Sequence, residues 1–174
     1  VLALVSLPFF MQHSLGLSVA QTGLLLAPWP LATKLTAPLA GRLIERVHPG
    51  ILGALGMGIF ALGLCLLATL GQVSSPMELG WRMAVCGIGI GLFQTPNNVT
   101  ITTSAPIQRS GGASGMLGTA RVLGQTLGTA LVAVLFHLVG SQGSGEVVCL
   151  WVALGLAVVS GILSGSRIKE ASPV

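Results

Sequence analysis

Arg121 stands alone in a long apolar stretch. It is the only Lys, Arg, Asp or Glu within 111–140, and the residues after it could complete a bilayer-spanning helix of ~20 residues. Gly118 lies three residues before it and Gln125 four residues after it, so the three share roughly one helix face. Because a guanidinium in hydrocarbon is costly, it must face a bundle interior, a partner or a water-filled cavity. Arg121 is therefore a candidate functional residue; the alternative is an arginine that only locks helices together.

A second apolar stretch, 23–41, combines a lysine with three prolines. Proline in a membrane helix frees backbone groups that neighbouring helices or water must satisfy, so this span is predicted to be kinked or interrupted inside a bundle. Lys34 lies eight residues before Arg42, which is ~12 Å along a helix. Its ammonium group either faces a cavity or snorkels toward the interface along its own stem.

A third stretch, 81–104, is apolar and glycine-rich but is interrupted by a glutamine, a proline and two asparagines. By helical rise, Gln94, Lys34 and Arg121 all lie ~12 to 15 Å deep, near one level at the midplane. A shared polar layer at this depth is typical of the substrate site of an alternating-access transporter. The candidate cavity-lining residues are Lys34, Gln94, Asn97, Asn98, Arg121 and Gln125.

The composition excludes a soluble globular fold. The chain has 174 residues, of which 52% are hydrophobic and 7% charged, whereas soluble domains carry about 25% charged residues. The apolar stretches predict an all-α integral membrane bundle of six helices, with the first truncated to about half a span. We expect this bundle to occupy 1–166 and a loose, polar cytoplasmic tail to occupy 167–174. The expected spans are 1–12, 23–41, 51–71, 81–104, 111–140 and 147–165.

Basic residues lie mainly on one side of the predicted bundle. By the positive-inside rule that side is cytoplasmic, and the C-terminus lies there too. The basic residues do not cluster with aromatic ones, so nucleic-acid binding is not predicted. The residues on this side are Arg42, Arg46, Arg109, Arg167 and Lys169, whereas the opposite side carries Arg82.

No Asp or Glu lies inside any predicted span. If protons drive transport, the carboxylate that carries them must lie outside this chain. Lys34 and Arg121 also need compensation, which such a carboxylate, an anionic substrate or cavity water could supply. The residues leave these three alternatives open.

The loop after the second predicted span resembles the loop motif G-x-L-x-D-R-x-G-R-K of the major facilitator superfamily. Gly41, Leu43 and Arg46 match the motif. Glu45 stands in place of its Asp, and His48 in place of its second Gly. The run RSGGASGMLGTARVLGQTLGTA resembles the penultimate helix of the fourteen-span drug:proton antiporters of the EmrB and QacA type, and FQTPNNVTI is similar to their preceding helix.

The resemblance covers essentially the whole chain and implies the C-terminal six-helix bundle of such a transporter. It implies a partner, the N-terminal transmembrane bundle of the same protein, and a location in the bacterial cytoplasmic membrane. It also implies export of lipophilic or cationic small molecules by alternating access, driven by a proton gradient and without a cofactor. By position, the conformational loop would contain Gly41, Glu45 and Arg46, and the penultimate-helix motif would contain Arg121, Gly124 and Gly128.

Glycine pairs at four-residue spacing predict places where helices approach closely in lipid. Each pair taken singly is a weak signal, because the chain contains 25 glycines. The pairs are Gly87 with Gly91, Gly111 with Gly115, Gly124 with Gly128, and Gly161 with Gly165.

Two rival readings remain. Gly112, Ser114 and Gly115 reproduce the GxSG pattern of rhomboid intramembrane proteases, but His137 lies on the same predicted helix, ~34 Å from Ser114. That distance prevents a catalytic dyad, so we do not predict an enzyme. The histidines and cysteines show no metal-ligand spacing, so no metal site is predicted either. The other reading is a non-transporting fragment of a truncated transporter, whose unpaired lining face would dimerise or be degraded.

Overall fold

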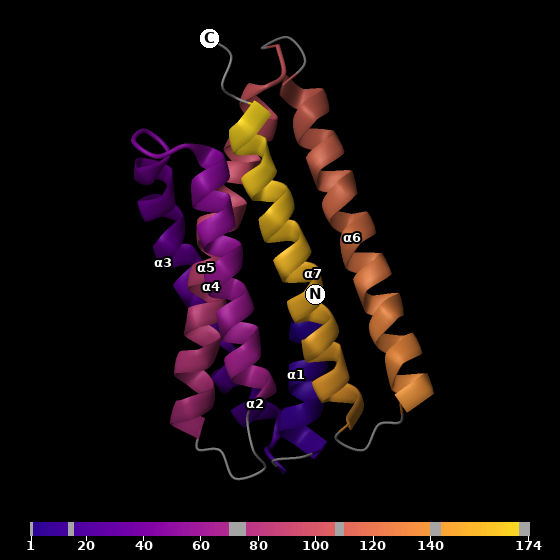
Figure 1. Ribbon diagram of the computed structural model, residues 1–174. Helices are drawn as coiled ribbons and strands as arrows, with labels where there is room; N and C mark the ends of the chain where they lie inside the picture. Colours follow the sequence, from indigo (N-terminus) through magenta and orange to yellow (C-terminus); the bar gives the residue numbers. More distant parts are fainter. Residues whose placement is uncertain (1, 14–15, 70–75, 107–109, 140–143, 171–174) are drawn as a thin grey trace.

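The computed structural model describes residues 2–13, 16–69, 76–106, 110–139 and 144–170. All the secondary structure in these residues is helical, so the predicted all-α fold is confirmed. The longer helices lie side by side with roughly parallel axes, and the chain direction alternates from α4 to α7 (Figure 1). The helices are α1 (Leu2–His13), α2 (Val19–Leu26), α3 (Pro28–Leu43), α4 (Pro49–Ala68), α5 (Pro76–Thr103), α6 (Ser110–Val139) and α7 (Ser144–Glu170).

The second predicted span consists of two helices, α2 and α3, with a break at Ala27. Ser18 starts α2 with a capping box: its hydroxyl accepts a hydrogen bond from the Gln21 N–H at 3.3 Å, and its own N–H donates to Gln21 Oε1 at 3.0 Å. This cap makes α2 begin at Val19, earlier than predicted. Pro28 begins α3, a position where its missing N–H costs no helical hydrogen bond. The predicted interruption of this span is confirmed.

Three described helices are long and apolar enough, by length and composition, to cross a membrane: α4, α6 and the part of α7 from Val147 to Ser166. The other predicted spans do not meet this standard. α1, α2 and α3 are each shorter than the ~20 residues of a full span, and α5 is long but carries polar residues in its second half. α5 nevertheless continues without a break through Pro96. α7 is helical up to Glu170, so the tail expected to be loose is helical over its first four residues, 167–170.

α5 packs against α3 on one side and α4 on another, and glycines allow both close approaches (Figure 1). On the α4 side, a Cβ at Gly56 would come within 2.6 Å of the Phe93 backbone nitrogen. On the α3 side, a Cβ at Gly91 would come within 3.0 Å of the Thr33 carbonyl oxygen. The Thr33 hydroxyl also donates to the Gly87 carbonyl oxygen at 3.0 Å. These contacts hold α5 in a fixed rotation and so determine where its polar side chains point.

α6 packs more loosely than the other long helices. Among its described residues only Val132 is buried. Phe136 forms an edge-to-face pair with Phe9 of α1, with ring centroids 5.7 Å apart. Val132 and Phe136 both lie in the second half of α6. The first half, which contains Arg121, is largely exposed and stands away from α3 and α4 (Figure 1).

The prediction that glycines of α6 bring helices together is not met within the described chain. A Cβ at Gly111, Gly115 or Gly124 would meet nothing within 4 Å. The physical reason is that no described helix comes close to these three glycines, although the Arg121 side chain on the same half of α6 reaches Asn98 of α5. Gly128 is half-buried, nearer the end of α6 that contacts α1.

Candidate functional site

Arg121 and Asn98 are two predicted lining residues that the structure brings into contact. An Nη of Arg121 donates to Asn98 Oδ1 across 3.4 Å and so links α6 to α5. Arg121 is exposed and Asn98 is half-buried. Hydrogen bonds from charged donors are usually ~2.7–2.9 Å long, so this one is weak and water or another group can replace it. Arg121 therefore lies on an open side of the bundle and is not enclosed by its helices.

Two glutamines extend this contact along both helices. Gln94 precedes Asn98 by one turn of α5, and Gln125 follows Arg121 by one turn of α6. Residues one turn apart share a helix face, and both glutamines are exposed. Gln94, Asn98, Arg121 and Gln125 together are called the polar strip below. The strip offers amide donors and acceptors around one positive charge.

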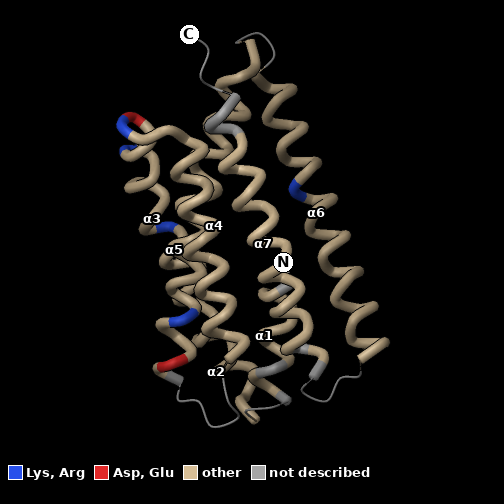
Figure 2. Tube along the Cα trace, viewed as in Figure 1, with Lys and Arg blue, Asp and Glu red and all other residues tan. Residues whose placement is uncertain are grey.

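Lys34 is exposed part-way along α3, whose buried residues include Trp29 and Ala40. Figure 2 shows isolated basic positions part-way along α3 and α6, whereas acidic positions lie near helix ends. Neither α3 nor α6 contains an Asp or Glu. A carboxylate that compensates Lys34 or Arg121 must therefore come from another element. That Lys34 shares one layer with the polar strip stays a prediction.

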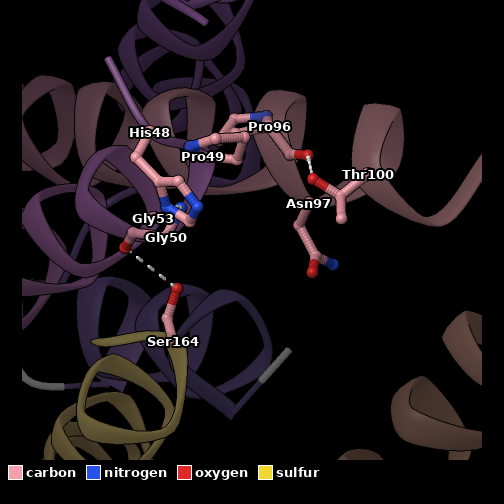
Figure 3. A pocket seen from close by; sticks show the side chains of 8 residues that line it. All are labelled: His48, Pro49, Gly50, Gly53, Pro96, Asn97, Thr100 and Ser164. Atoms are coloured by element: carbon pink, nitrogen blue, oxygen red, sulfur yellow. Dashed lines mark hydrogen bonds between the residues drawn. The ribbon is translucent and has the colours of Figure 1, made fainter. Parts of the chain in front are cut away.

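Asn97 lies apart from the polar strip, although the sequence grouped it with Asn98. Successive residues of a helix point ~100° apart, so the two amides face different neighbours. Asn97 lines a cavity of about 190 Å³ with His48, at the start of α4, and Ser164 of α7 (Figure 3). The cavity lies at the end of α4 that follows the loop between α3 and α4.

The conformational loop implied by the family resemblance is a tight turn between α3 and α4. The backbone N–H groups of Arg46 and Val47 both donate to the Leu43 carbonyl oxygen, at 3.0 and 2.8 Å. Gly41, Glu45 and Arg46 are exposed, so the charged side chains of the turn are accessible to a partner. Of the other residues that set the predicted orientation, Arg109 lies outside the described residues, as do the side chains of Arg167 and Lys169.

The structure does not assemble a hydrolytic site around Ser114. Ser114 and His137 both lie on the single helix α6, ~34 Å apart by helical rise. A nucleophile and its base must come within about 3 Å, so these two residues cannot work together. Within the described part of the chain, no three His, Cys, Asp or Glu side chains gather in a way that could hold a metal ion.

Two residues without an assigned role in the sequence make specific contacts. Arg82 of α5 donates from Nη1 to the Leu66 carbonyl oxygen in the last turn of α4, at 2.6 Å. His48 accepts a hydrogen bond from the Gly50 N–H at 3.1 Å. The second contact had a sequence signal, because His-Pro-Gly places a proline where a helix begins. The contact of Arg82 had no sequence signal, because it joins two different helices.

The Major Facilitator Superfamily model matches residues 1–172 of the chain. The chain belongs to this superfamily. It is 56% identical to the uncharacterized transporter YebQ of Escherichia coli (strain K12) over 170 residues, covering 98% of this chain and 37% of YebQ. It is 32% identical to the multidrug resistance protein Stp of Mycobacterium tuberculosis, over 71% of this chain and 23% of Stp. It is 24% identical to the quinolone resistance protein NorB of Staphylococcus aureus, over 88% of this chain and 34% of NorB.

The chain therefore spans less than two fifths of the length of these relatives. Superfamily membership and the helical, apolar structure agree: this is an all-α chain of a Major Facilitator Superfamily membrane protein. The loop motif and the run around Arg121, from which the sequence suggested the superfamily, both lie within the matched residues. The expected membership is confirmed.

Proposed function

We propose that this chain is the C-terminal bundle of an exporter that expels lipophilic or cationic small molecules in exchange for protons. The observation that carries the proposal is the contact between exposed Arg121 and Asn98, part-way along two helices. A guanidinium so placed in a membrane has to face water, a ligand or another bundle. The multidrug and quinolone resistance proteins among the relatives support drugs as the substrate class.

Alternating access needs a surface that is polar at mid-membrane and free to separate from its partner bundle. The first half of α6 has both properties, because it is exposed and carries Arg121. α4 contains no charged residue and packs closely against α5, which suits a rigid scaffold. The long hydrogen bond from Arg121 to Asn98 lets the guanidinium move to another partner at little cost.

Like charges repel, so we do not expect Arg121 to bind a cationic compound itself. A guanidinium near a carboxylate favours the ionised form of the acid and so promotes proton release. We infer that this carboxylate belongs to the N-terminal bundle, since neither α3 nor α6 supplies one. The transporter would lie in a bacterial cytoplasmic membrane, with the basic loop between α3 and α4 on the cytoplasmic side.

The test compares Arg121→Ala and Arg121→Lys with Thr119→Ala in the full-length transporter. Thr119 is a matched control, because it is exposed on the same helix and its hydroxyl only donates to the Gly115 carbonyl oxygen within α6. Export of a fluorescent lipophilic cation from proteoliposomes is measured at equal protein amounts, with and without an imposed pH gradient. We expect Arg121→Ala to slow gradient-driven export by about 10- to 100-fold, the equivalent of a hydrogen bond to a charged group. Arg121→Lys should retain part of the rate, and Thr119→Ala all of it.

Each part of the proposal can fail separately. Normal export by Arg121→Ala would reduce this arginine to a packing role and remove the main support for the site. Wild-type export that ignores the pH gradient would contradict proton coupling. Absence of export for every lipophilic cation tried, in liposomes that hold correctly folded protein, would contradict the substrate class.

A further inference from the structure

His48 is the residue on which the first turn of α4 depends for its hydrogen bonds. The imidazole Nδ1 accepts from the Gly50 N–H at 3.1 Å. The His48 carbonyl oxygen accepts from the N–H groups of Ile51 and Leu52, at 3.0 and 3.2 Å. Pro49, at the first helical position, has no N–H to satisfy. The donors that a helix leaves unpaired at its N-terminus are therefore met here largely by one histidine.

The cap requires one protonation state of the imidazole. A nitrogen that accepts a hydrogen bond carries no proton, so the proton of neutral His48 must be on Nε2. In an imidazolium both nitrogens are donors, and Nδ1 would then point an N–H at the Gly50 N–H. A positive charge at a helix N-terminus is also unfavourable, because the helix dipole is positive there. His48 is exposed, so a proton can reach it from solvent.

The capped turn also contacts α7. The Ser164 hydroxyl donates to the Gly50 carbonyl oxygen at 3.5 Å, so both backbone groups of Gly50 are held, one by His48 and one by Ser164 (Figure 3). One turn further along α4, a Cβ at Gly53 would collide with the Ser164 hydroxyl. The cavity described above lies beside this junction, so the turn has room to move when its cap is lost.

Among the residues that the structure describes, few charged groups lie near the imidazole. The other residues that line the cavity, from α4, α5 and α7, are Pro49, Gly50, Gly53, Pro96, Asn97, Thr100 and Ser164, none of which titrates. The loop before His48 carries exposed Glu45 and Arg46. Beyond Ser164, α7 continues with Arg167, Lys169 and Glu170, whose side chains lie outside the described residues. None of these charges restores an acceptor to an imidazolium.

We propose that protonation of His48 uncaps α4 and loosens its contact with α7. The device is a helix cap that works only while the histidine is neutral, and histidine changes charge between about pH 5 and 8. It would make the packing of α4 on α7 respond to the pH on the side of the membrane that carries the loop between α3 and α4. The inference does not depend on what the protein transports or on whether protons drive it.

The test measures hydrogen exchange of the α4 first turn, Gly50 to Gly53, in the full-length protein in lipid nanodiscs from pH 5 to 8. His48→Asn is the matched control, because asparagine is a good N-cap that does not titrate. His48→Ala has no cap at any pH. Dividing the wild-type rate by the His48→Asn rate at each pH removes the intrinsic pH dependence of exchange. We expect a ratio near one at pH 8 that rises to about fivefold at pH 5, the factor equivalent to a typical lost N-cap. His48→Ala should exchange faster than His48→Asn by that factor throughout.

A ratio that stays constant from pH 8 to pH 5 would overturn the proposal. A second measurement needs no variant: nitrogen-15 spectra of the His48 imidazole in the wild-type protein. We expect the tautomer with its proton on Nε2 at pH 8. The tautomer with its proton on Nδ1 would overturn the proposal even if His48→Asn failed to fold.

Discussion

Substitution of Gly56 by alanine tests the closest approach between α4 and α5. An added Cβ would lie 2.6 Å from the Phe93 backbone nitrogen and 2.8 Å from the Gly89 carbonyl oxygen, and ordinary contact begins at 3.4 Å. The helices must therefore separate by up to 3.4 − 2.6 = 0.8 Å, because backbone atoms cannot rotate away as a side chain can. Overpacking of this kind costs about 1–3 kcal/mol.

Gly58→Ala is the matched control for this substitution. Gly58 lies on the same helix, and a Cβ there would meet nothing within 4 Å. Both substitutions gain the same ~0.5–1 kcal/mol of helix propensity, so the difference between them isolates the steric term. We expect Gly56→Ala to be less stable than Gly58→Ala by about 1–3 kcal/mol in equilibrium unfolding of the full-length protein in mixed micelles, followed by circular dichroism. Equal stability of the two variants would refute the claim that α4 and α5 meet backbone to backbone here.

Two further predictions concern contacts between helices. Thr33→Val removes the hydroxyl that donates to the Gly87 carbonyl oxygen of α5. We expect it to lower the free energy of unfolding by ~0.6 kcal/mol more than Thr36→Val does in the same assay, because the Thr36 hydroxyl donates only within α3. An equal loss for both variants would contradict a stabilising hydrogen bond between Thr33 and Gly87. Arg82→Gln removes the charged donor to the Leu66 carbonyl oxygen, and we expect a loss of about 1.5–3 kcal/mol, partly recovered by Arg82→Lys. Wild-type stability of Arg82→Gln would show that this contact does not hold the end of α4.

Much of the fold could be predicted because its causes are local in sequence. Its prolines predicted an interruption of the second span, which the structure places before Pro28, and the low fraction of charged residues indicated helices in lipid. The error at the start of α2 was also local: the capping box of Ser18 and Gln21 is readable in sequence and places the helix start at Val19. The sequence predicted that the polar residues of α5 line one cavity, and it did not separate Asn97 from Asn98. Asn97 and Asn98 face different neighbours because α3 and α4 fix the rotation of α5.

The contacts of α6, in contrast, could not be predicted from the sequence. Glycine spacing alone predicted close packing at Gly111, Gly115 and Gly124, yet a small residue only permits an approach that other contacts must supply. No described helix supplies it in the first half of α6. The partner of Arg82 could not be predicted either, because a carbonyl at the end of a neighbouring helix leaves no pattern in sequence.

The amino-acid sequence by itself determined that this protein is helical, lies in a membrane and belongs to the major facilitator superfamily, because apolar length, charge fraction and motif spacing are properties of the chain alone. Only the tertiary structure decided that Arg121 meets Asn98, that Asn97 joins His48 beside a cavity, and that α6 leaves its polar side open. The reason is that these contacts depend on the rotation and separation of packed helices. Both are set by close backbone contacts between helices at glycines such as Gly56 and Gly91, and the sequence of one helix does not determine which helix packs against it.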